Sequence, residues 1–289
     1  MCEKKKTPLG QGVLSMALAN FDSWLRSPRT ILMLLFIAAI CYLQMCGYEM
    51  KLNETGYTMH LGETLFYEFK FGCNMPMTTV LFLIMVSELP RRIAYQQYSL
   101  IRSSRCRWMA AQLLYCLMMV VAMIALIALF IALMALPLVT HGNGWSDAAR
   151  IASGEIEPYE ALISEFILNN YTPFTATLLA MIPVFCFWLT MVFVILMFGV
   201  WGSPVFGVLM YAFLMVANVT ILFEAFPFQL ILPIQYATLD NIISSYDGKE
   251  IQQFLKVMGV YAALIVSLVA VMMISVKRVE LNFHAESKQ

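Results

Sequence analysis

Residues 166–223 read FILNNYTPFTATLLAMIPVFCFWLTMVFVILMFGVWGSPVFGVLMYAFLMVANVTILF, and none of them is Asp, Glu, Lys or Arg. A short Gly- and Pro-containing segment, Gly199-Val-Trp-Gly-Ser-Pro204, is the main interruption of this apolar run. A helix needs about 20 apolar residues to cross the hydrocarbon of a bilayer. The run is therefore long enough for two membrane-spanning helices joined by a tight turn, and it predicts an integral membrane protein.

The composition of the whole chain agrees with this prediction. Hydrophobic residues make up 61% of the chain and charged residues 12%, about half the charged fraction of a typical soluble domain. The formal net charge is zero, so nothing in it indicates a nucleic-acid partner. The seven cysteines, mostly within apolar segments, form no CxxC pair, so buried thiols are expected rather than disulfides or metal ligands. The polar N-terminus has no signal-peptide pattern.

Six uncharged apolar stretches have about the length of a membrane crossing. Because a backbone in lipid must satisfy its own hydrogen bonds, each is expected to be a helix. Pro183 is expected to kink the fourth stretch. The prediction is an all-α membrane domain over residues 30–276, preceded by an N-terminal region, 1–29, and followed by a tail, 277–289. The six predicted spans are 30–48, 71–87, 112–139, 174–198, 204–223 and 257–276.

The basic residues predict the orientation of these spans. With the N-terminus in the cytoplasm, 13 of the 18 Lys and Arg residues fall on the cytoplasmic side. The reverse topology would place that excess outside, against the positive-inside bias. We therefore expect a multi-pass protein of the plasma membrane with both termini cytoplasmic.

An amphipathic helix is predicted over residues 12–27, immediately before the first span. Its apolar stripe repeats at helical spacing, and Ser27-Pro28 is expected to end the helix. Such a helix lies in the interface of the membrane, here on the cytoplasmic side. A simple surface anchor without a mechanical role is the alternative. The residues of the stripe are Leu14, Leu18, Phe21 and Leu25, with Ala17 and Trp24 beside it.

The loop after the second span, residues 87–108, is the most basic loop of the chain. It has helical character after Pro90 and carries aromatic and apolar residues on one stripe, a pattern typical of a docking helix. The alternative is that its arginines only fix the topology and contact lipid phosphates. The candidate docking residues are Arg91, Arg92, Tyr98, Ile101, Arg102 and Arg105.

Two further segments lie outside the predicted spans. The outward segment 140–173 is acidic; Ser146 is expected to cap a short helix there and Pro158 to start another, forming a cover over the outer mouth. The segment 226–236 is apolar but is broken by Pro227 and Pro233. It is too short to cross and is expected to be re-entrant and covered by protein.

Residues that would support chemistry are missing from the predicted spans. The three histidines, His60, His141 and His284, fall outside them, and no carboxylate or basic side chain lies near the middle of a span. Ion-coupled carriers normally need such groups. The sequence also has no HExxH motif and no GxxxxGK[ST] phosphate loop. We therefore expect no enzymatic activity and no cofactor, and any uphill transport would take its energy from another polypeptide.

The order of these parts resembles the membrane subunit of a type 2 ATP-binding-cassette (ABC) exporter. The most specific patch is Glu88-Leu-Pro-Arg-Arg with Leu100-Ile-Arg-Ser-Ser-Arg-Cys-Arg-Trp108 and Gln112-Leu-Leu-Tyr115. It is similar to the stretch in permeases of this family that leads into the third span. A weaker similarity is Leu232-Pro-Ile-Gln-Tyr236, before the last span.

The resemblance implies a dimer of permease chains in the membrane lipid, each bound to a separate ABC ATPase. It implies that residues 90–105 are the coupling helix resting on the ATPase. The amphipathic helix, with Leu18, Phe21, Trp24 and Leu25, would be the connecting helix. The alternative function is a non-transporting scaffold or sensor built on the same fold. Neither the substrate nor the identity of the second permease follows from the sequence.

Overall fold

The computed structural model describes residues 9–55, 59–69, 74–90, 104–137, 139–140, 142, 144–147, 149, 165–219, 237, 239, 242 and 250–278. Helices hold 89% of these residues, which confirms the predicted all-α fold. The helices are α1 (Leu9–Leu25), α2 (Pro28–Thr55), α3 (Leu61–Phe69), α4 (Asn74–Val86), α6 (Arg105–Ala135), α8 (Glu165–Asn170), α9 (Pro173–Trp201), α10 (Pro204–Val219) and α12 (Glu250–Arg278). Two parallel two-residue strands, β1 (Met59–His60) and β2 (Val139–Thr140), pair with each other.

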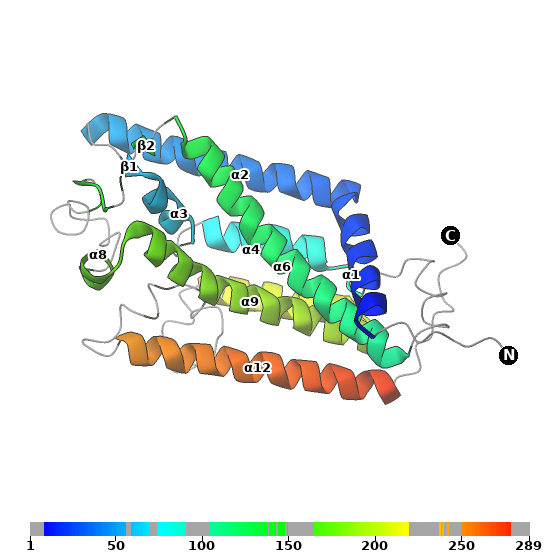
Figure 1. Cartoon of the computed structure of the whole chain (residues 1–289). Helices are drawn as coiled ribbons and strands as arrows, with labels where there is room; N and C mark the ends of the chain where they lie inside the picture. The colour runs from blue at the N-terminus through cyan, green and yellow to red at the C-terminus, as the bar shows by residue number, and fades with distance from the viewer. Residues whose placement is uncertain are drawn as a thin grey trace.

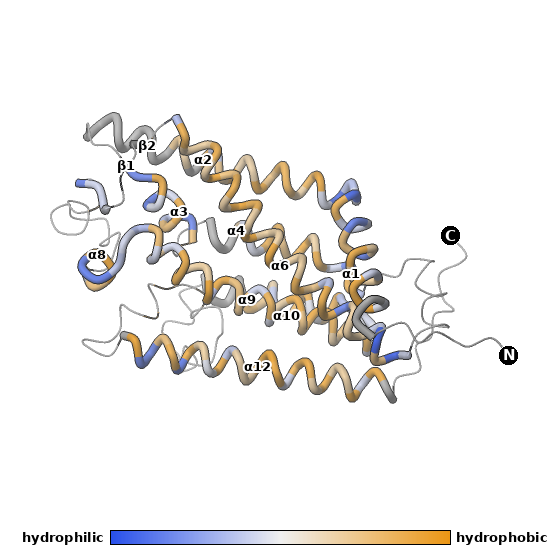
Figure 2. Tube along the Cα trace, in the orientation of Figure 1, coloured by the Kyte–Doolittle hydropathy of each residue, from blue (hydrophilic) through white to orange (hydrophobic). Residues whose placement is uncertain are grey.

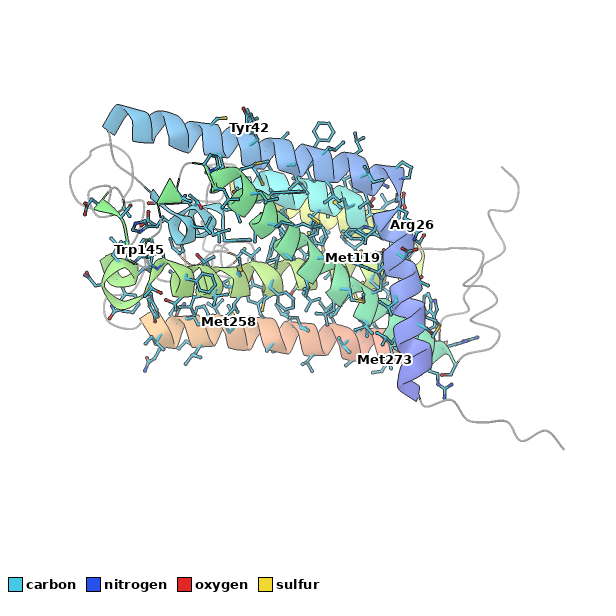
Figure 3. All side chains as sticks on the ribbon, turned by 45° about the horizontal axis from the view of Figure 1, so that its top comes forward. Arg26, Tyr42, Met119, Trp145, Met258 and Met273 are labelled. Carbon is cyan, nitrogen blue, oxygen red and sulfur yellow. The ribbon has the colours of Figure 1, made fainter. Side chains whose placement is uncertain are left out.

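The long helices form a bundle, and α1 crosses one of its ends (Figure 1). Helices α6, α10 and α12 pack against α9, while α2 packs against α4 and α6. Apolar side chains of α6 and α9 fill the interior, where Met119 and Val192 are fully buried. Tyr42 on α2 is instead exposed on the outside of the bundle (Figure 3).

Within the described ranges, three helices are long and apolar enough to cross a membrane: α6, α9 and the Ile251–Val276 part of α12. A fourth crossing results if α1 and the first part of α2 are counted as one span, although they meet at an angle of 65°. Figure 2 shows how apolar residues dominate these helices. These long apolar helices are compatible with a multi-pass membrane protein.

The six predicted spans are not confirmed by the described residues. In place of the second span, 71–87, the structure has α4 with 13 residues, and residues 70–73 lie outside the described part. In place of the fifth, 204–223, it has α10, which is described as far as Val219. The six-span arrangement stays a prediction.

Local capping explains where two of the long helices begin and end. Helix α6 starts at Arg105, seven residues before the predicted span, because Ser104 Oγ accepts a hydrogen bond from the N–H of Arg107. Helix α9 starts at Pro173 behind the cap residue Thr172 and continues through Pro183. It ends at Gly202, whose φ of 156° lies in the region that favours glycine.

Helix α3 is a feature that the sequence analysis did not anticipate. Its residues from Glu63 to Phe69 are all buried, and the helix packs against α6 and α9. It carries the carboxylates of Glu63 and Glu68 into the bundle. Both had been assigned to the loop between the first and second predicted spans.

Candidate functional site

The bundle has two ends with different structures. One end, called the α1 end below, carries α1, the end of α4, the start of α6 and the turn between α9 and α10 (Figure 1). The opposite end, called the α8 end, carries α3, α8 and the two strands. Of the residues predicted to dock a partner, Arg105 at the start of α6 belongs to the α1 end.

Most of these predicted docking residues lie outside the described part of the chain. This holds for Arg91, Arg92, Tyr98, Ile101 and Arg102. Arg105 is described; it is the first residue of α6 and is exposed. The prolines of the predicted re-entrant segment, Pro227 and Pro233, also lie outside. The roles of all these residues stay predictions.

The residues on both sides of segment 91–103 are held firmly. On one side, Arg29 at the start of α2 donates from Nη1 to Glu88 Oε1 at 2.7 Å and from Nη2 to Ser87 Oγ at 2.8 Å. This ion pair is half exposed, so it contributes only about 0–1 kcal/mol to stability. Its effect is positional, because it fixes the first turn of α2 to the exit of α4.

Gly199 contacts the two residues that precede segment 91–103. Leu89 and Pro90, joined by a cis peptide bond, are buried. They lie so close to Gly199 of α9 that a Cβ atom there would overlap the Leu89 carbonyl and the Pro90 ring. On the other side of the segment, the capped start of α6 is followed by the buried Trp108. Segment 91–103 is therefore joined at its two ends to α4 and α6, and through these contacts to α2 and α9.

Helix α1 was predicted from its apolar stripe, and the structure shows which side faces the bundle. The buried residues are Ala17, Asn20 and Trp24, which share one face at helical spacing, and α1 packs on α6. Phe21 is partly buried beside the Trp24 ring, at a centroid distance of 5.5 Å. Leu18 and Leu25 are 47% and 36% exposed. The small side chains of Ala17 and Asn20 allow α1 to approach α6 on this face. Leu18 and Leu25 therefore lie on a different side of α1.

In the interior, one hydrogen bond joins α4 to α9. Trp188 Nε1 donates to Thr79 Oγ1 at 2.9 Å. The Trp188 ring also packs on Phe82, with the ring centroids 5.0 Å apart. Both tryptophan and threonine are almost fully buried, so this contact fixes the register of the two helices.

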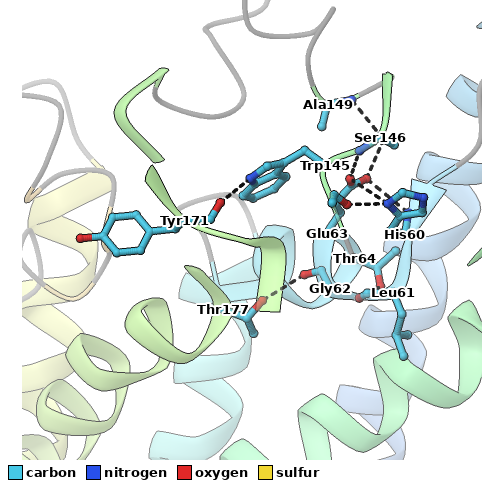
Figure 4. Close-up of polar contacts among 11 residues, drawn as sticks. His60, Leu61, Gly62, Glu63, Thr64, Trp145, Ser146, Ala149, Tyr171 and Thr177 are labelled. Carbon is cyan, nitrogen blue, oxygen red and sulfur yellow. Dashed lines mark hydrogen bonds and ion pairs between the residues drawn. The ribbon is translucent and has the colours of Figure 1, made fainter. Parts of the chain in front are cut away.

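The α8 end holds a cluster around the fully buried carboxylate of Glu63 (Figure 4). Both the N–H and the hydroxyl of Ser146 donate to this carboxylate, the hydroxyl at 2.7 Å. The N–H of His60 donates to Glu63 Oε2 at 3.3 Å. We call Glu63, His60 and Ser146 the Glu63 clamp. Ser146 Oγ also accepts from the N–H of Ala149 at 3.3 Å, the capping contact that the sequence predicted.

The segment that carries Ser146 has three further attachments. His60 Nδ1 donates to the carbonyl of Gly144 at 2.6 Å, which requires a proton on Nδ1. Trp145 Nε1 donates to the carbonyl of Tyr171 at 2.7 Å, and its ring packs edge-on against Phe66 of α3. We call the described residues between Val139 and Ala149 the strap, because they join α3 to the start of α9.

Sequence reasoning missed Glu63 as a functional candidate. A signal was present, since Glu63 and Glu68 stand among Leu65, Phe66, Tyr67 and Phe69 in a segment too short to cross. Within the described residues, no three His, Cys, Asp or Glu side chains gather in a way that would hold a metal ion. The hydrogen bonds of the cluster join α3 to the segment around Ser146, 83 residues further along the chain.

Comparison with known proteins gives no relative for this chain: no protein-family model, no curated protein and no solved structure matches it.

Proposed function

We propose that this chain is the permease subunit of an ATP-driven exporter of the type 2 ABC class, coupled to a separate ATPase. The observation that supports the proposal best is the attachment of segment 91–103 at both of its ends. Arg29 joins its entry to α2, Gly199 joins it to α9, and its exit continues directly into α6. A force on this segment would reach four helices.

The proposed arrangement follows from the charge pattern. The α1 end faces the cytoplasm and the α8 end faces outward, with six spans and both termini cytoplasmic. Helix α1, at 65° to α2, lies along the membrane surface as the connecting helix, with Leu18 and Leu25 toward lipid. The exposed apolar residues of α2 and α10, such as Phe36 and Phe206, contact lipid or a second permease copy.

In the proposed mechanism, ATP binding closes the ATPase subunits and displaces residues 90–105. The displacement passes to α4 through Leu89 and Pro90, and from there to α9 at Gly199. ATP must favour the outward-open state through its own differential binding, because a ligand shifts an equilibrium only to that extent. Chemistry at the nucleotide belongs to the partner subunit, and the permease contributes the pathway.

The test is co-purification with a candidate ABC ATPase from the same genome, followed by measurement of its ATP hydrolysis. We expect Tyr98→Glu and Ile101→Asp each to lower the amount of bound ATPase at least about tenfold, because a charge in a docking pocket costs more than 1.4 kcal/mol. Ile251→Asp is the matched control, since Ile251 is an exposed isoleucine at the α8 end of α12.

Three results would count against the proposal or redirect it. Unchanged ATPase binding in both loop variants would remove the docking role of residues 90–105. Equal losses in the Ile251→Asp control would show that the loss comes from general damage. Binding of the ATPase without any stimulation of hydrolysis by exported compounds would favour the scaffold or sensor.

A further inference from the structure

The packing of α3 indicates a part that can move. Helix α3 has nine residues, and those from Glu63 to Phe69 are buried against α6 and α9. It is nevertheless too short to cross a membrane, and it enters the bundle from the α8 end (Figure 1). Helix α3 therefore occupies the space beside α6 and α9 at the α8 end.

The position of α3 in the bundle depends on the hydrogen bonds that the buried Glu63 carboxylate receives. A carboxylate removed from water is strongly disfavoured unless hydrogen-bond donors replace the water. Among the described residues, two of the donor groups to this carboxylate belong to Ser146, 83 residues away in the sequence. Another is the N–H of His60, at the start of α3 itself. Helix α3 is therefore held in the bundle by contacts that the strap supplies.

The strap and α3 are both attached near the start of α9. Trp145 binds the Tyr171 carbonyl, and the Thr177 hydroxyl lies 3.0 Å from the Gly62 carbonyl and 2.8 Å from that of Pro173. Gly62 also lies close to Pro173, so that a Cβ atom at Gly62 would be 2.9 Å from the Pro173 Cβ. Through these contacts, a shift of the first turn of α9 acts on α3 (Figure 4).

We infer that α3 is the gate at the α8 end of the bundle and that the Glu63 clamp holds it closed. The inference rests on the proposed function, because it assigns α3 to the exit of the translocation pathway. Gly62 of α3 is hydrogen-bonded to Thr177 within α9, whereas Trp145 of the strap is hydrogen-bonded to Tyr171, which lies before α9. A shift of α9, transmitted from Gly199 at the α1 end, therefore moves α3 relative to the strap and separates Ser146 from Glu63. The carboxylate then takes its hydrogen bonds from water, and α3 leaves its closed position.

Hydrogen–deuterium exchange of the full-length protein in lipid nanodiscs tests the clamp. In the wild type, we expect the amides of residues 61–69 to be protected. Ser146→Ala removes one donor, and Glu63→Gln replaces an acceptor oxygen by an NH2 group. Both variants are expected to accelerate the exchange of residues 61–69 at least about tenfold, with the larger effect in Glu63→Gln. The exchange of residues 187–196 in α9 is expected to stay unchanged.

Ser267→Ala is the matched control, because the Ser267 hydroxyl is exposed and bonds only the Leu264 carbonyl among the described residues. In the Ser267→Ala variant, the exchange of residues 61–69 is expected to equal that of the wild type. The role of the Glu63 clamp in holding α3 is contradicted if residues 61–69 stay protected in both clamp variants. This role is also contradicted if the exchange of residues 187–196 accelerates by the same factor, because the variants would then loosen the whole bundle.

A second arm tests the gate with the ATPase bound and held by a non-hydrolysable ATP analogue. Faster exchange of residues 61–69 in the wild type is expected. If the ATPase binds but α3 stays protected, the gate is wrong and the permease assignment stands. If the ATPase does not bind, the proposed function fails together with the gate, while the variants in nanodiscs still report on the clamp.

Discussion

A Trp188→Ala variant is expected to lose about 3–5 kcal/mol of stability, as for other large buried aromatic residues cut back to alanine. Trp188 is 1% exposed, packs on Phe82 and donates a hydrogen bond to Thr79. Its removal leaves a cavity between α4 and α9. Thermal unfolding in detergent, followed by circular dichroism, should show a melting temperature lowered by roughly 10 °C.

Trp201→Ala is the control for this experiment. Trp201 lies on the same helix, α9, but is 51% exposed. Its loss is expected to cost at most about 1 kcal/mol, because substitutions at exposed positions have small effects. Equal melting temperatures for the two variants would mean that the α4–α9 contact does not hold the bundle together.

The second large effect is expected at Gly199, where Gly199→Ala forces a Cβ atom onto the Leu89 carbonyl and the Pro90 ring. Backbone atoms and a proline ring move aside less easily than a flexible side chain. The free energy of unfolding is therefore expected to fall by about 1–3 kcal/mol, although alanine has a better helix propensity than glycine. The variant is also expected to weaken the stimulation of the ATPase, because α9 no longer contacts the entry of segment 91–103.

Gly259→Ala separates the clash from the propensity effect. Gly259 is also inside a long apolar helix, α12, but beyond its own helical backbone and chain neighbours no atom of the described residues lies within 4 Å of a Cβ atom built there. This variant is expected to keep its stability or gain about 0.5–1 kcal/mol. A Gly199→Ala variant as stable as Gly259→Ala would contradict the close contact between α9 and Leu89.

The long helices were predictable because their signals are local. Helix α9 differs from its predicted span by one residue at its start and three at its end, since Thr172, Pro173 and Gly202 mark its limits in the sequence. The helix predicted over residues 12–27 was predictable for the same reason, although α1 begins at Leu9 and ends at Leu25. Which face of α1 would be buried was not, because that depends on the surface of α6.

The Glu63 clamp could not be predicted, for a physical reason. A carboxylate is expected in water unless donors are supplied, and the donors of Glu63 come from Ser146, far along the chain. The separation of α3 from α4 was hidden for a related reason. The apolar run 71–87 has nearly the length of a span, and only the tertiary packing shows a buried helix before it.

The proposed export mechanism requires segment 91–103 to face the cytoplasm and to receive the force of the ATPase there. Its most direct test is labelling with a membrane-impermeant maleimide in a variant without the native cysteines. A Tyr98→Cys substitution should react only after the cells are made permeable, whereas Asp147→Cys, at an exposed position of the α8 end, should react in intact cells. Reaction of the Tyr98→Cys variant in intact cells would contradict the topology and the transport mechanism built on it.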